Sequence, residues 1–215
     1  MKLIKAWKKT AAVLLAACLL TACGGSSDDD NIIHEKDLPY GATLVEDKTT
    51  YSIPVEYDRR FVPVKALETA VRYYQTIQDR DAAAFEALQF PLWHDYYLKD
   101  VLGGEFTDAA ILENTCKELD EYAGGEFAFS QIAVTGFITD NVNEVTQNTV
   151  ALMDKMAEEK GKTKVSEGIT EFYEMTITRY LTTKAAAVKG PTAKFIENEL
   201  LYVFCHDGQW YVIYN

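Results

Sequence analysis

The C-terminal stretch ELLYVFCHDGQWYVIYN, residues 199–215, carries the strongest structural signal in the sequence. Its dipeptide Asp207-Gly208 separates two runs rich in aromatic and β-branched residues. An Asp-Gly pair between such runs is typical of a two-residue β-hairpin loop. We therefore predict strands over 195–206 and 209–214, and strands joined by so tight a turn are antiparallel.

Two more strands are expected before this hairpin. Residues 127–139 are rich in Phe, Ile, Val and Thr, the composition of a strand. Apolar side chains also alternate with polar ones from Ile169 to Ile177, which indicates a long, half-buried strand. Between them, residues 142–160 return to helical spacing, so one helix is expected to be inserted among the strands.

The chain before residue 127 has mostly helical periodicity. Pro63 is a favourable first helical residue, and apolar side chains then repeat at helical spacing over 64–78. Asp81 and Thr107 are residue types that cap helix N-termini, and glycine pairs commonly end helices. The predicted helices are 64–78, a short one after Asp81, one over 91–102 ended by Gly103-Gly104, and one from Thr107 to Gly124-Gly125.

This order of elements predicts an α+β fold. Helices that precede an antiparallel sheet are expected to pack together on one face of it. The sheet is predicted to have about four strands. An additional strand over 50–57 would lie at an edge, because Pro54 has no amide hydrogen for a central strand.

Two stretches resemble the nuclear transport factor 2-like (cystatin-like) superfamily. They are VRYYQTIQDRDAAAFEAL, residues 71–88, and the C-terminal hairpin quoted above, and the likeness in element order covers 63–215. The resemblance implies a cone in which a curved sheet wraps around the helices and encloses a cavity. The superfamily includes isomerases, dehydratases, cyclases and many binding modules, so the fold does not settle function.

The N-terminus has the parts of an export signal. Four lysines precede a short apolar run, residues 11–20, which is shorter than the roughly 20 residues that a membrane span needs. Leu20-Thr21-Ala22-Cys23 then resembles the lipobox of bacterial lipoproteins, in which the peptidase cuts before the cysteine and the thiol receives diacylglycerol. We predict a lipoprotein signal peptide over 1–22; the alternative is a plain signal peptide followed by an incidental cysteine.

The residues after Cys23 suit a membrane tether. The run GGSSDDD, residues 24–30, is flexible, and its three aspartates repel one another and anionic lipid. Acyl chains on Cys23 would give stable anchoring. The sequence thus predicts a lipid anchor, acidic tether and lead-in over 23–62, a domain over 63–215, and a place on the extracytoplasmic side of the cell membrane.

Composition excludes several functions. The formal charge is −12, and removal of a leader with four lysines and no acid takes it to −16. Nucleic-acid binding depends on Lys and Arg at phosphates, so no nucleic-acid partner is expected. Cys116 and Cys205 are the only cysteines left for the domain. We predict two buried, unbridged thiols, because a disulfide requires Cα atoms within about 7 Å.

WHDYY, residues 93–97, contains the catalytic candidates. An imidazole can act as an acid or a base near neutral pH, which makes His94 one candidate, and Asp95 is a second candidate acid or base. Neighbours on a helix point in different directions, so the alternative is an exposed polar pair between core aromatics. His206 and Asp207 are expected to belong to the hairpin turn and His34 to the tether. No metal spacing such as HExxH occurs, and neither a metal nor a cofactor is predicted.

Aromatic residues supply the binding candidates. They are interpreted either as a core with a solvent-exposed rim or as the lining of a cavity for a small apolar ligand, a peptide or a protein partner. Our preferred hypothesis is a membrane-anchored extracytoplasmic lipoprotein with a non-catalytic binding domain. The alternatives are a lyase- or isomerase-type enzyme that uses acid and base residues of the cone, and a structural envelope protein. The binding candidates are Tyr73, Tyr74, Trp93, Tyr97 and Trp210.

Overall fold

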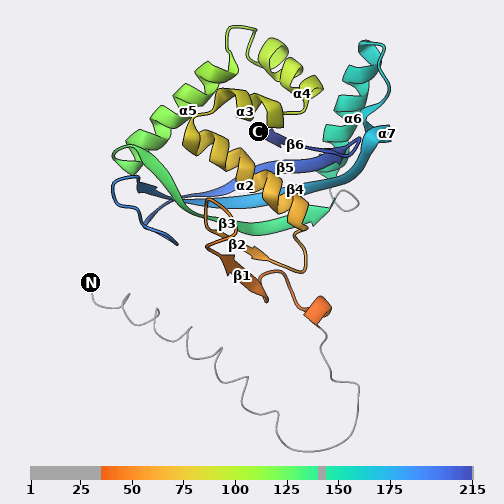
Figure 1. The fold of residues 1–215 in the computed structure, drawn as a ribbon. Helices are drawn as coiled ribbons and strands as arrows, with labels where there is room; N and C mark the ends of the chain where they lie inside the picture. Colours follow the sequence, from red (N-terminus) through yellow and green to blue (C-terminus); the bar gives the residue numbers. More distant parts are fainter. Residues whose placement is uncertain (1–34, 140–143, 215) are drawn as a thin grey trace, which may run out of the picture. The chain divides into compact units, whose positions relative to one another are not determined.

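The computed structural model describes residues 35–139 and 144–214 (Figure 1). The signal peptide, Cys23, the acidic run and His34 lie outside these ranges. The chain divides into two units, Met1–Leu38 and Pro39–Asn215. A single 3₁₀ turn, η3 (Glu35–Asp37), is described in the first, and all other elements belong to the second. No helix within the described ranges has both the length and the apolar composition that crossing a bilayer requires.

The second unit is α+β, as predicted. Its sheet has six strands in sequence order, and all neighbours are antiparallel except β2 and β3, which are parallel. The predicted hairpin is confirmed, because His206 pairs with Gln209 across Asp207-Gly208. The strands are β1 (Leu44–Asp47), β2 (Val55–Asp58), β3 (Phe127–Thr139), β4 (Ile169–Thr183), β5 (Lys194–His206) and β6 (Gln209–Tyr214).

The prediction of about four strands was wrong. The compact unit begins at Pro39, and residues expected to be a lead-in contribute β1 and β2. The strand expected at an edge over residues 50–57 corresponds to β2. It does not lie at an edge, because β2 lies between β1 and β3. Pro54 is compatible with this place because it directly precedes β2 and uses only its carbonyl, which accepts a hydrogen bond from the Ile132 amide at 2.9 Å.

Helix ends follow the predicted chemistry. The Asp81 carboxylate accepts from the Ala84 amide at 3.0 Å, and the Thr107 hydroxyl accepts from the Ala110 amide at 3.3 Å. Gly124 ends its helix in the left-handed region, with φ of 82°. The helices are α2 (Val64–Asp79), α3 (Ala82–Leu88), α4 (Pro91–Tyr96), the π-helical turn η4 (Tyr97–Val101), α5 (Asp108–Ala123), α6 (Glu144–Glu159) and α7 (Val165–Gly168). The single helix expected over 91–102 is therefore α4 followed by η4.

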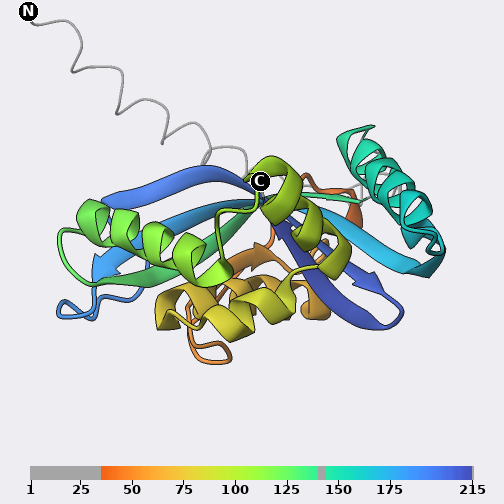
Figure 2. The same cartoon turned by 90° about the horizontal axis from the view of Figure 1, so that it is seen from above.

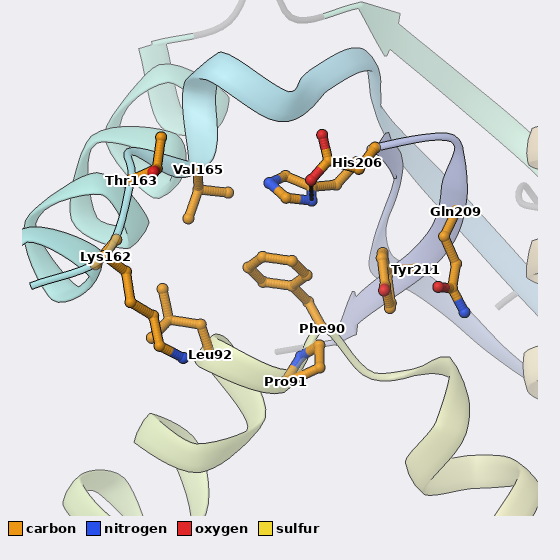
Figure 3. Close-up of a pocket in the computed structure, with 11 residues that line it drawn as sticks. Phe90, Pro91, Leu92, Lys162, Thr163, Val165, His206, Gln209 and Tyr211 are labelled. Carbon is orange, nitrogen blue, oxygen red and sulfur yellow. Dashed lines mark ion pairs between the residues drawn. The ribbon is translucent and has the colours of Figure 1, made fainter. Parts of the chain in front are cut away.

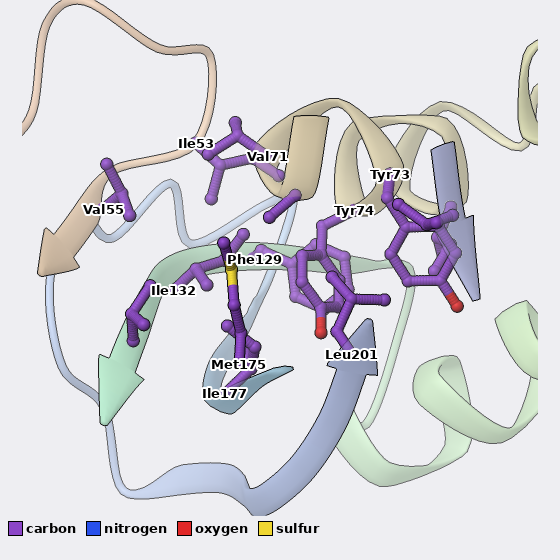
Figure 4. Close-up of a cluster of buried hydrophobic side chains, with 14 of the residues drawn as sticks. Ile53, Val55, Val71, Tyr73, Tyr74, Phe129, Ile132, Met175, Ile177 and Leu201 are labelled. Atoms are coloured by element: carbon purple, nitrogen blue, oxygen red, sulfur yellow. The ribbon is translucent and has the colours of Figure 1, made fainter. Parts of the chain in front are cut away.

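One face of the sheet packs against α2, α3 and α5. Tyr74, on α2, is fully buried against Phe129 of β3, with ring centroids 5.7 Å apart (Figure 4). Met175 and Leu201 continue this core across β4 and β5. Cys116 is also part of it, and its thiol donates to the Ile77 carbonyl at 3.3 Å. Cys205 is buried too, and both cysteines are free, as predicted.

The opposite face carries a second core. The expectation that the helices preceding the sheet all pack on one face was wrong for α4, because Leu92 belongs to this second core. Phe172 and Phe204 point to this side and pack with Met153 and Met156 of α6. Figure 2 shows α6 on the side of the sheet away from α2 and α3. The physical reason is visible in β5, where residues 201–205 are all buried. A strand with consecutive apolar residues requires cover on both faces.

Candidate functional site

A cleft of about 360 Å³ lies between the α6–α7 segment and the β5–β6 hairpin (Figure 3). It belongs to the face of the sheet covered by α6, and the start of α4 closes one side. Phe90 and His206 lie in the middle, with Val165 on one side and Tyr211 on the other. The complete lining is Phe90, Pro91, Leu92, Ala157, Lys162, Thr163, Val165, His206, Asp207, Gln209 and Tyr211.

Aromatic packing fixes the floor of the cleft. Phe90 is the N-cap residue of α4, and Pro91 occupies the first turn, where its missing amide hydrogen is not needed. The Phe90 ring lies 5.2 Å from those of Phe204 and Tyr211 and 5.1 Å from that of His206, between centroids. Rings at these distances stabilise one another beyond simple burial. The floor is thus a preformed apolar surface.

The hairpin turn positions His206 over α7. Its Nδ1 lies 3.3 Å from Oδ2 of Asp207, whose own amide donates to the Gly168 carbonyl at 2.9 Å. A Cβ at Gly168 would lie 2.5 Å from His206 Nε2 and 2.8 Å from its Cδ2. A side chain at position 168 would therefore displace the imidazole.

Two charged residues line the cleft, Lys162 and Asp207, and the Asp207 carboxylate lies beside His206. Lys162 follows α6 and is exposed, and among the described residues no carboxylate lies within ion-pair distance of its ammonium. The His206 imidazole is a second basic group in the lining, and it carries positive charge when it is protonated. The cleft therefore combines an apolar floor with an unpaired cation, an arrangement that suits an apolar molecule with an acidic group.

The predicted binding aromatics do not line this cleft. Tyr73 and Tyr74 belong to α2 and are buried in the core, where burial raises their pKa values well above the usual range of tyrosine. Tyr97 packs on the ring of Tyr214, with 5.5 Å between centroids. The two tryptophans lie elsewhere: Trp93 packs on Tyr96 at 5.8 Å, and Trp210 stacks on Tyr173 at 6.4 Å.

The catalytic candidates are separated from each other. Asp95 is exposed, and its carboxylate lies 3.4 Å from the Lys99 ammonium and 3.6 Å from that of Lys160. His94 instead contacts Asp108, at 3.1 Å from Nε2 to Oδ2, and both side chains are largely buried. Burial raises the pKa of Asp108, and His94 opposes the rise. Acid–base chemistry at His94 would thus involve Asp108, which the sequence analysis did not single out.

A second partly buried ion pair lies on the α2 face of the sheet. Arg179 of β4 and Glu199 of β5 pair with each other, with 12% and 19% of their side chains exposed. The guanidinium lies 5.8 Å from the centroid of the Tyr74 ring, within the range of a cation–π contact. This pair is explained by packing within the core and suggests no ligand.

Comparison of the chain with protein-family models, curated proteins and solved structures finds no match in any of the three. Function is therefore inferred from the chemistry of the site itself.

Proposed function

We propose that the chain is a membrane-anchored lipoprotein, held through Cys23 on the extracytoplasmic side, whose folded domain binds a ligand without catalysis. The cleft beside α6, α7 and the β5–β6 hairpin is the proposed binding site. Its volume of about 360 Å³ falls in the lower part of the range of small-molecule pockets. The proposal extends the lipobox resemblance and the likeness to the nuclear transport factor 2-like superfamily, which includes many binding modules.

The observation that carries the proposal is the contrast between the floor and the rim. Phe90, Leu92 and Val165 supply apolar surface, while Lys162 supplies a cation with no acidic partner among the described residues. An apolar molecule gains from the floor about 25 cal/mol for each Å² removed from water. A carboxylate or similar anion on that molecule would pair with the lysine. We infer that the ligand is a small apolar anion.

A fluorescent naphthalene sulfonate, which is both apolar and anionic, tests the binding site. We expect the full-length chain to bind 1-anilinonaphthalene-8-sulfonate saturably, with one dominant site. Lys162→Gln should weaken binding by about fivefold to tenfold, the loss of one partly solvated charge contact. The matched control is Lys155→Gln, which removes an exposed lysine of α6 outside the cleft.

A second variant tests the apolar floor of the cleft. Val165→Trp should fill the cleft and abolish probe binding, while circular dichroism checks that the variant is folded. Equal affinity in the wild type, Lys162→Gln and Val165→Trp would refute this site.

The anchor has its own test: Cys23→Ser should abolish signal processing and lipid attachment, measured by mass spectrometry of the membrane fraction. A correctly processed and still membrane-bound variant would refute the anchor without affecting the cleft.

A further inference from the structure

Three consecutive helices bring together one histidine and two carboxylates. Glu86 lies on α3, His94 on α4, and Asp108 is the first residue of α5. One ligand atom from each of the three lies within 4.8 Å of the others. The cluster lies outside the cleft described above, since none of the three residues lines it.

The spacing is that of ligands around a single ion. His94 Nε2 and Asp108 Oδ2 are 3.1 Å apart. Two donor atoms bound about 2.0–2.2 Å from one metal ion, at angles between about 90° and 110°, are themselves roughly 2.8–3.6 Å apart. The His94–Asp108 pair is therefore at the separation that joint coordination requires. Glu86 has to approach by a short distance, which its exposed side chain permits.

An independent observation points into this cluster. Asp108 is nine-tenths buried, with 9% of its surface exposed, and its Oδ1 has no hydrogen-bond partner among the described residues. Buried carboxylate oxygens are normally satisfied, so such an atom requires an explanation. A cation bound at this carboxylate would supply one. It would also reduce the repulsion between the carboxylates of Glu86 and Asp108.

We propose that Glu86, His94 and Asp108 bind a divalent transition-metal ion of the zinc type. Imidazole together with carboxylates favours Zn²⁺, Co²⁺ or Mn²⁺ over Ca²⁺ and Mg²⁺, which prefer oxygen ligands alone. Three protein ligands leave at least one coordination position for water. Because Glu86 is exposed, an ion can reach the site from solvent. The proposal does not depend on the lipid anchor or on ligand binding in the cleft.

The alternative occupant of the cluster is a proton. If His94 is an imidazolium, it forms a simple ion pair with Asp108 and no metal binds. Isothermal titration of the full-length chain, purified without a histidine tag, with ZnCl₂ and with CoCl₂ distinguishes the two. We expect a site of one ion per chain with micromolar affinity, and visible absorption bands from bound Co²⁺.

Variants locate the ion. Glu86→Gln changes an exposed residue, so it should leave folding intact while weakening Zn²⁺ at least tenfold. His94→Gln and Asp108→Asn should abolish the site and the Co²⁺ bands. Asp95→Asn is the matched control, because Asp95 is adjacent to His94 but lies outside the cluster, and its affinity should equal that of the wild type. Absence of binding up to millimolar Zn²⁺, or unchanged affinity in Glu86→Gln and His94→Gln, would overturn the proposal.

Discussion

Asp58 is expected to contribute more to stability than any exposed acid of the domain. It is the last residue of β2 and is fully buried. Arg60 donates to both carboxylate oxygens, from Nη2 at 2.6 Å and from Nε at 3.0 Å. The Gly41 amide and the Thr43 hydroxyl each donate at 2.9 Å. This carboxylate therefore connects the loop before β1 to the end of β2.

The loss of unfolding free energy expected for Asp58→Asn follows from these contacts. Asp58→Asn keeps the shape but replaces one acceptor oxygen with a donor that faces Arg60 and either the Gly41 amide or the Thr43 hydroxyl. Removing one partner of a buried pair costs about 3–5 kcal/mol. The Arg60 side chain is 10% exposed and also donates to the Pro39 carbonyl, so solvent and that carbonyl offset part of the loss. We expect a loss of about 3 kcal/mol, equivalent to roughly 6–12 °C in Tm.

The pH dependence has a definite sign. Hydrogen bonds from Arg60 hold the pKa of Asp58 well below its usual range. A lowered carboxyl pKa stabilises the fold above the unfolded pKa of about 3.9, and this stabilisation is lost as the pH falls below it. The difference in unfolding free energy between the wild type and Asp58→Asn should therefore be full at pH 7 and shrink below about pH 4.

Urea unfolding of the full-length chain at several pH values measures this difference. The control is Asp47→Asn, because the Asp47 carboxylate also accepts two amides, from Thr49 and Thr50, but is only partly buried. We expect a much smaller loss for the control. A loss under about 1 kcal/mol for Asp58→Asn at pH 7, or a difference that does not change with pH, would refute the reasoning.

Three further predictions concern the hairpin, α7 and the thiols. Gly168→Ala should cost about 1–3 kcal/mol and alter the His206 imidazole resonances, because its Cβ would overlap that ring; an unchanged spectrum would contradict this. Gly208→Ala should lower stability by about 1 kcal/mol in urea, since Gly208 has φ of 79°; no loss would mean that the turn relaxes. Cys116 and Cys205 should resist a thiol reagent in the folded domain and both react after unfolding without reductant, as located by peptide mass; failure to react before reduction would show a disulfide.

Local chemistry made part of the fold predictable. Asp207-Gly208 identified the hairpin, and the composition of residues 127–139 gave the bounds of β3 as observed. Predictions failed where the signal depended on pairing distant segments. Nothing within residues 44–58 indicates a parallel neighbour more than 70 positions later, yet Val55 pairs with Ile132. In contrast, the unbroken apolar run Leu201–Cys205 was enough to predict that both faces of the sheet are covered.

The His94–Asp108 contact shows why sequence spacing did not reveal the candidate metal cluster. The two residues lie on different helices, separated by the π-helical turn η4 and by Gly103-Gly104, both with positive φ. This irregular connection sets the direction in which α5 begins, and so whether its first residue reaches His94. Motifs such as HExxH are recognisable because a single helix fixes the spacing of the ligands. A site built from three different helices has no such period, so its residues are found only after the chain has folded.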